Sequence, residues 1–163
     1  MSWWTHVNAS ARIDAMIFSK EHADKFVRCL KRDFGKQVKW ESDEKTWKDA
    51  EEHPEKYLPY GSEGGLTIKI DRNNKLHCLA FCVVHIYGDL RDRGYSKEEI
   101  QKDFIDWFKE KLKPYMIRQA FMEVEWGGGT ETWCFANDEV FYKDQQDYWE
   151  ERRLKELNEN EVR

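Results

Sequence analysis

Two histidines, His6 and His85, are the residues of this sequence whose type and position could support acid–base chemistry. Each lies in an alternating or apolar segment that is typical of a strand. Because imidazole titrates near neutral pH, two histidines facing each other across a cleft could act as general acid and general base in phosphodiester cleavage. The alternative is structural, since a histidine near a strand end can simply hydrogen bond to the backbone. The choice depends on how the two strands are placed.

The strings around these histidines resemble the paired motifs of the two-histidine phosphoesterases, in which histidine is followed by an apolar residue and then by serine or threonine. Here the third position is Asn8 after His6 and Tyr87 after His85. Both strings therefore depart from the motif. We expect a protein that is not an enzyme, with the binding or hydrolysis of a cyclic or linear nucleotide at His6 and His85 as the alternative.

A larger set of aromatic and basic residues is expected to bind a partner. The chain has 8 Trp, 7 Tyr and 9 Phe among its 163 residues, and aromatic residues and arginine often dominate protein interfaces. Many tryptophans and tyrosines fall in expected loops and ends, where they either anchor a loop to the core or form a docking surface. The expected binding residues are Arg12, Trp40, Trp47, Tyr60, Phe81, Tyr87 and Arg91.

The string Gly88-Asp89-Leu90-Arg91-Asp92 is expected to form a turn between a strand and a helix. Backbone amides in such a turn could bind an anion with help from Arg91. The string lacks the glycines and lysine of a nucleotide-binding fingerprint. A turn whose loop amides are capped by aspartate is therefore the favoured interpretation.

Composition and charge argue against several classes of function. The four cysteines form no CxxC or Cys/His metal spacing, so no metal or cofactor is expected, and they are interpreted as small reduced core residues. No apolar run is long enough to span a membrane and the start lacks a secretory signal, which predicts a cytoplasmic protein. The net charge of -5 disfavours general polyanion binding.

Periodicity and capping signals predict the elements that position these residues. Residues 4–15 alternate between apolar and polar, the apolar run 76–87 is typical of a buried central strand, and Ser96 begins a strongly amphipathic helix. The expected order is strand 4–15, helix 19–35, strand 66–70, strand 76–87, helix 96–112, strand 116–126 and strand 131–136.

This order predicts an α+β fold, a ferredoxin-like βαββαβ sandwich with an extra C-terminal hairpin strand. Strands 4–15 and 76–87 would be neighbours in the middle of an antiparallel sheet whose other face is open. Residues 1–136 are the expected domain, with an aromatic insertion at 36–65 that holds a short helix near 44–51. Residues 137–163 are expected to form a charged helical tail that is docked by its aromatic side chains before it frays. The insertion, the tail or a second copy of the chain is expected to cover part of the open face, which also suits a homodimer.

Three strings, 2–8 (SWWTHVN), 59–64 (PYGSEG) and 86–92 (IYGDLRD), resemble those of small phage and prophage proteins of Gram-positive bacteria. The resemblance implies a viral accessory protein of the host cytoplasm that acts by binding, as an inhibitor of a defence system such as a CRISPR nuclease. Acidic residues beside aromatic anchors favour a basic partner, such as a nucleic-acid-binding defence enzyme. Direct nucleic-acid binding is not expected, because the aromatic strings of RNA-recognition sheets are absent.

Overall fold

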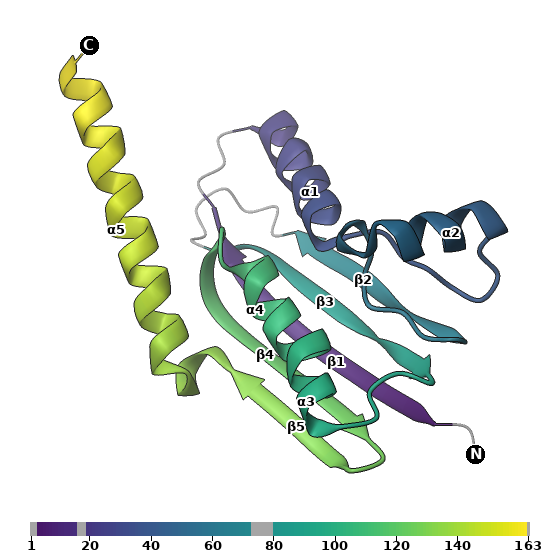
Figure 1. The fold of residues 1–163 in the computed structure, drawn as a ribbon. Helices are drawn as coiled ribbons and strands as arrows, with labels where there is room; N and C mark the ends of the chain where they lie inside the picture. Colours follow the sequence, from purple (N-terminus) through teal and green to yellow (C-terminus); the bar gives the residue numbers. More distant parts are fainter. Residues whose placement is uncertain (1–2, 16–18, 73–79, 163) are drawn as a thin grey trace.

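The computed structural model describes residues 3–15, 19–72 and 80–162, and side chains of these residues except those of residues 80, 81 and 162. The described chain forms a five-stranded antiparallel sheet with helices on one of its faces, so the fold has two layers (Figure 1). Its strands are β1 (Trp4–Asp14), β2 (Gly64–Arg72), β3 (Ala80–Arg91), β4 (Met116–Trp126) and β5 (Gly129–Cys134). Its α-helices are α1 (Lys20–Phe34), α2 (Glu44–Glu52), α3 (Lys97–Ile100), α4 (Trp107–Leu112) and α5 (Glu139–Val162). Short 3-10 turns at Pro54–Lys56 and Phe135–Asn137, and a π-helical segment at Gln101–Asp106 that joins α3 to α4, complete the order.

The strand order is β2-β3-β1-β4-β5, so β1 lies in the centre of the sheet. Ala9 of β1 stands opposite Ile86 of β3 on one side and Met122 of β4 on the other, and both pairings are antiparallel. The prediction that the first strand and the central apolar run are neighbours is confirmed. The predicted antiparallel pairing of β2 with β3 and the hairpin of β4 with β5 are confirmed as well.

The core lies between one face of the sheet and the helices α1 and α3–α4. Ala9 and Ala11 are almost fully buried, and their small side chains let the helices approach the sheet closely. Burying each large core side chain contributes about 1.5–3 kcal/mol. The helix side of the core is supplied by Leu30, Phe34, Ile100, Phe104, Phe108 and Leu112.

The two main helices begin where capping signals predict them. The Ser19 hydroxyl accepts a hydrogen bond from the His22 backbone amide at 3.1 Å, and Ser96 does the same for the Glu99 amide at 3.1 Å. Gly35, with φ 117°, ends α1. These caps depend on neighbours within three residues, which is why the sequence alone could locate them.

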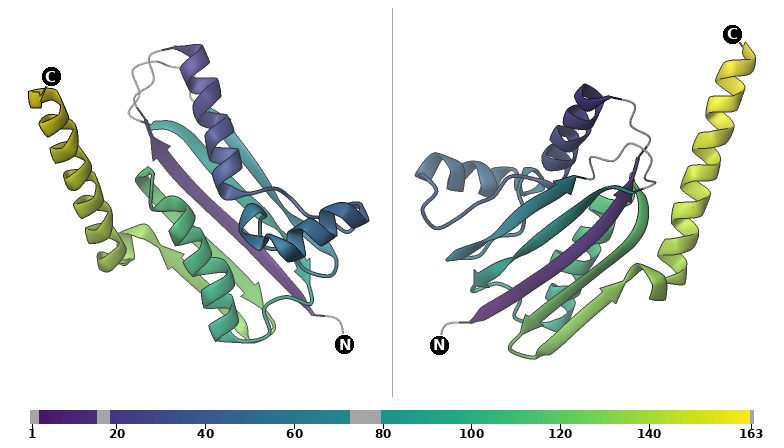
Figure 2. Two further views of the ribbon diagram at one scale, coloured as in Figure 1. Left: turned by 45° about the horizontal axis from the view of Figure 1, so that its top comes forward. Right: turned by 180° about the vertical axis from the view of Figure 1, so that it is seen from behind.

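The insertion at residues 36–65 packs beside β2 and α1, and does not lie over the open face of the sheet (Figures 1 and 2). It has a small core of its own, in which the centroids of the Trp47 and Tyr60 rings lie 5.6 Å apart. The Tyr60 hydroxyl also donates a hydrogen bond to the Ala50 carbonyl at 3.2 Å. Trp47 and Tyr60 therefore anchor the insertion.

Helix α5 leaves the body of the protein after its first half (Figure 1). Phe141 is buried and Trp149 is half-buried, but residues 150–161 are all exposed. Leu154 and Leu157 are 49% and 53% exposed, so they take no part in docking this helix. No helix in the described ranges is long and apolar enough to cross a membrane.

The predicted turn at residues 88–92 is also wrong. Gly88 to Arg91 are the last residues of β3, and they pair with β1 and β2. The chain turns only at Asp92, after which Gly94 leads into α3.

Candidate functional site

Three segments that are far apart in the sequence meet at one end of the sheet, which we call the loop end. It comprises residues 3–6, 60–64 and 89–95. Trp4 stands opposite Arg91, and Gly64 stands opposite Leu90, so the starts of β1 and β2 flank the end of β3. The strings singled out for their resemblance to phage proteins thus contribute to one structure (Figure 1).

Backbone hydrogen bonds tie the three segments of the loop end together. The Asp92 amide donates to the Trp3 carbonyl at 2.8 Å, and the Ser62 amide donates to the Arg91 carbonyl at 2.9 Å. The Arg91 amide donates in turn to the Glu63 carbonyl at 3.1 Å. The side chains of this end are therefore held on a closed framework and not on free loops.

Two glycines allow this close approach. A Cβ at Gly61 would lie 2.2 Å from the Arg91 carbonyl oxygen, and one at Gly64 would lie 2.0 Å from that of Asp89. Asp92 adopts φ 56°, the left-handed region that non-glycine residues other than Asn and Asp rarely occupy. Strain of this kind is found mostly where surrounding contacts enforce it.

Charged side chains line the exposed side of the loop end. The His6 Nδ1 lies 2.5 Å from the Asp89 Oδ1, and both side chains are more than half exposed. The Arg91 guanidinium donates to the Glu63 carboxylate at 2.6 Å. These contacts orient the charges, but each is worth little in stability because exposed ion pairs are screened by water.

Asp92 is held as a carboxylate. Its Oδ2 accepts a hydrogen bond from the Ser62 hydroxyl at 2.7 Å, and its Oδ1 accepts one from the Tyr95 hydroxyl at 3.3 Å. The bond from Ser62, with the smaller effects of Tyr95 and Arg91, holds the pKa of Asp92 below its ordinary value. Asp92 therefore presents a fixed negative charge at neutral pH.

Aromatic rings surround these charges. The Trp3 and Tyr95 rings lie 6.2 Å apart, and Trp3 covers the β4–β5 turn so closely that a Cβ at Gly127 would lie 1.9 Å from its ring. Tyr95 is 56% exposed and Trp4 is 39% exposed. The loop end therefore combines a rigid backbone, accessible aromatic surface and fixed carboxylates.

Comparison with known proteins gives no relative. No protein-family model, curated protein or solved structure matches this chain. What the loop end does must therefore be argued from its own geometry.

The structure does not bring the two histidines together. His6 stands opposite Asp89 and His85 stands opposite Ser10, so the histidines share the open face but lie four positions apart, about 13 Å along the strands. His85 has a separate partner, since its Nε2 lies 3.3 Å from the Asp71 Oδ2. The alternative interpretation, in which the two rings face each other across one cleft, does not fit this arrangement, because the strand register separates them.

This separation leads to a prediction about catalysis. We expect no turnover when the protein is incubated with cyclic and linear nucleotides and the products are separated by chromatography, because a phosphodiester cannot contact both rings at once. Nucleotide hydrolysis that is lost in His6→Ala and in His85→Ala, but kept in the exposed control His22→Ala, would contradict it.

The other predicted binding residues are scattered. Arg12 and Tyr87 lie on the open face of the sheet, Arg91 lies at the loop end, and Trp40 is exposed on the insertion. The Phe81 side chain lies outside the described residues. Trp47 and Tyr60 belong to the core of the insertion, as described above. The structure gathers no more than two of these residues at any one place.

Sequence reasoning missed Trp4, Asp92 and Tyr95 as site residues. Trp4 and Asp92 fall within the strings that resemble phage proteins, so those strings were the available signal. Tyr95 lies outside them, and only the bond from its hydroxyl to Asp92 assigns it to the site.

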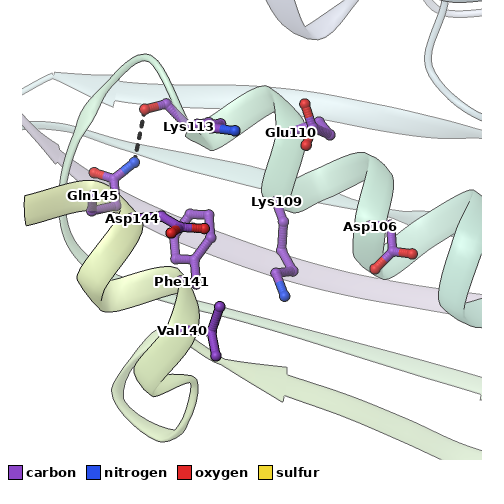
Figure 3. Close-up of a pocket in the computed structure, with 8 residues that line it drawn as sticks. All are labelled: Asp106, Lys109, Glu110, Lys113, Val140, Phe141, Asp144 and Gln145. Carbon is purple, nitrogen blue, oxygen red and sulfur yellow. Dashed lines mark hydrogen bonds between the residues drawn. The ribbon is translucent and has the colours of Figure 1, made fainter. Parts of the chain in front are cut away.

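A groove lies between α4 and α5 (Figure 3). Gln145 crosses it and donates to the Lys113 carbonyl at 2.8 Å, while Phe141 fills its floor. These contacts serve to dock α5 on the body. Across the described ranges, no group of three or more His, Cys, Asp or Glu side chains is arranged to hold a metal ion.

Proposed function

We propose that this protein is a phage accessory protein that inhibits a bacterial defence system by docking on a host protein through its loop end. The observation that carries the proposal is the convergence of three distant strings on one rigid surface that exposes aromatic rings beside the ionised Asp92. Exposed aromatic rings on a fixed framework lose little conformational entropy on binding, which is what interface anchors require.

The partner that fits this surface is a protein with a basic patch. Asp92 is ionised and its side chain is 39% exposed, whereas the other two carboxylates of the loop end, Glu63 and Asp89, contact Arg91 and His6. Charges of one sign steer an oppositely charged partner and discourage others. A nucleic-acid-binding defence enzyme, such as a CRISPR nuclease, has a basic channel of this kind, and carboxylates placed in it would take the position of phosphates.

The proposed architecture is the ferredoxin-like sandwich. Two observations support it. The order of the strands in the sheet is β2-β3-β1-β4, and along the chain α1 lies between β1 and β2 while α3–α4 lie between β3 and β4. In this plan β5 is an addition at the β4 edge. The loop end lies at the strand ends next to the start of α3, because the Gly94 and Tyr95 amides donate to the Glu99 carboxylate.

The proposal predicts a loss of inhibition in two loop-end variants. With purified host defence nucleases, we expect the wild-type protein to bind one of them and reduce its DNA cleavage. Tyr95→Ala should weaken binding by about 30-fold, because it removes an interface anchor worth about 2 kcal/mol. Asp92→Asn should weaken it by about 3- to 10-fold and reduce the salt dependence, since asparagine keeps the backbone conformation but removes the charge.

Two substitutions on α5 serve as matched controls. Tyr142→Ala removes an exposed tyrosine and Asp147→Asn removes an exposed carboxylate. Both residues lie on α5 and outside the loop end. Binding is measured by interferometry, and melting temperatures verify that all four variants fold. If no nuclease is bound, or if the control variants weaken binding as much as the loop-end variants, docking through this end is refuted.

A further inference from the structure

The face of the sheet opposite α1 and α3–α4 has no helix over it in the described part of the chain (Figure 2, right). Its side chains come from alternate residues of all five strands. The large aromatic ones among the described side chains include Trp4, at the loop end, and Tyr87 and Phe121, nearer the centre. Tyr87 on β3 is 46% exposed and Phe121 on β4 is 42% exposed. They stand on opposite sides of Asn8 and Ser10 of β1, near the centre of the face.

Across β3, β1 and β4 the charges on this face are separated along the strands. At the β2 edge, Asp71 lies in the same row as Arg12, and its Oδ1 is 3.7 Å from the Lys69 Nζ, so these two opposite charges offset each other. Near the loop end, the register places Asp89, His6 and Glu125 in one row across β3, β1 and β4. Glu123 stands one row further in, opposite Asn8. We call these four residues the acidic end of the face.

The opposite end of the face carries Arg12, Gln119 and Arg118, which we call the basic end. Arg12 pairs with Gln119 and Ile13 pairs with Ile117, so Arg118 is the extra residue of a β-bulge. A bulge redirects a side chain. This bulge brings the Arg118 guanidinium to the same buried carboxylate that Arg12 approaches.

That carboxylate belongs to Asp14, which is only 8% exposed. Its Oδ2 accepts from the Arg118 Nε at 3.1 Å, and its Oδ1 lies 4.0 Å from the Arg12 Nε. Arg118 is thus held by a hydrogen bond to Asp14 and Arg12 lies at the limit of ion-pair distance from the same carboxylate, while the Arg12 and Arg118 side chains remain 42% and 48% exposed. The remaining nitrogens of these two side chains are the donors that the basic end offers.

We propose that two copies of this chain associate through this face, related by a two-fold axis that crosses the strands between the levels of Asn8 and Ser10. Such an axis places each strand over the same strand of the other copy but reverses its direction. The acidic end of one copy then lies over the basic end of the other. Glu125 lies over Gln119 and Arg118 of the second copy, and the His6–Asp89 pair lies over its Arg12.

The alternative two-fold axis, parallel to the strands, would place acidic end on acidic end and is therefore disfavoured by charge. Packed sheets lie about 10 Å apart, a gap that arginine and glutamate side chains can bridge. The same operation covers Tyr87 and Phe121, whose exposed rings would otherwise stay in water.

The area of the face is sufficient for a specific dimer. Five strands at about 4.8 Å spacing and seven residues at about 3.4 Å give roughly 600 Å² per copy, or about 1,200 Å² in all. That is the lower end of the range for stable interfaces. Because much of the face is charged, we expect a dimer that weakens as salt is raised.

Charge reversal tests the arrangement directly. Sedimentation equilibrium of the full chain should give about twice the 19.7 kDa mass at about 0.05 M NaCl, falling toward the monomer at about 0.5 M. Glu125→Arg and Gln119→Glu should each weaken dimerisation at least 10-fold, because each places like charges across the interface. An equimolar mixture of the two variants should recover the dimer, since the arginine introduced in one variant then meets the glutamate introduced in the other.

The controls carry the same charge changes on α5, as Glu150→Arg and Gln146→Glu, and should dimerise like the wild-type protein. A wild-type protein that is monomeric at low salt, a mixture that does not recover the dimer, or controls that also dissociate would each overturn the proposal. Docking through the loop end is tested with other variants, Tyr95→Ala and Asp92→Asn, and with another measurement, the binding of a nuclease. The dimer proposal and the docking proposal can therefore fail independently.

Discussion

Replacing Asp138 with alanine is expected to lower the free energy of unfolding by about 3 kcal/mol and to release α5 from the body of the protein. The Asp138 carboxylate accepts hydrogen bonds from Lys109 at 2.7 Å, from the Trp133 indole at 2.9 Å and from the Phe141 amide at 2.9 Å. One side chain thus joins α4, β5 and the first turn of α5. Losing a helix cap costs about 1 kcal/mol, and losing charge-assisted bonds costs more.

The effect should depend on pH in a defined direction. Burial raises the pKa of Asp138, but the bonds from Lys109, the Phe141 amide and Trp133 outweigh it and lower the pKa to about 2. In the unfolded chain the pKa is near 3.9, so this carboxylate stabilises the fold by about 2 kcal/mol above that pH. The contribution is lost as pH falls toward 2. Urea unfolding of the wild-type protein and Asp138→Ala should therefore differ most near neutral pH.

Asp144→Ala is the matched control, because it removes an exposed carboxylate from the same helix and groove (Figure 3). We expect it to change the free energy of unfolding by less than about 0.5 kcal/mol. An Asp138→Ala protein as stable as this control would show that the three bonds do not hold α5 in solution.

Replacing Gly64 with alanine is expected to have an effect of similar size at the other end of the sheet. Gly64 has φ 80°, where an L side chain is strained by about 1–2 kcal/mol. Its added Cβ would also lie 2.0 Å from the Asp89 carbonyl oxygen, a backbone atom that cannot move without breaking the β2–β3 pairing. We expect a loss of about 3 kcal/mol or more in urea unfolding.

Gly129→Ala separates the effect of backbone strain from the effect of the steric clash. Gly129 also has a positive φ, 139°, but a Cβ there would meet no atom within 4 Å. It should cost about 1–2 kcal/mol from backbone strain alone. Amide hydrogen exchange should show faster opening of residues 60–64 and 89–92 in Gly64→Ala but not in Gly129→Ala. Equal losses in the two variants would mean that the close approach at the loop end does not matter for stability.

The sequence predicted most elements because their signals are local. The alternation along β1 follows from one buried and one exposed face, and Ser19 and Ser96 bond to amides three residues away. The same local reasoning failed at Gly88, which was expected in a turn. In the structure a Cβ at Gly88 would lie 2.2 Å from the Gly65 carbonyl oxygen, so this glycine permits close strand pairing instead.

The candidate site was the least predictable part. His6 and His85 were correctly expected on neighbouring strands, but their distance depends on register, which their own neighbours do not encode. The partners of Asp92, namely Ser62 and Tyr95, are likewise defined by strand pairing. Similarly, the exposure of Leu154 and Leu157 depends on where α5 leaves the body of the protein.

The order and type of the elements and the buried face of β1 could be predicted from the sequence, because side-chain periodicity and capping act over a few residues. Which strand ends meet, where the charges of the open face lie and which aromatic rings remain exposed could be seen only in the folded chain. These depend on strand register and on packing between segments far apart in the chain, such as the pair of Thr5 with Arg93, whose separation is 88 residues. Long-range pairing therefore turned three separate strings into one candidate surface.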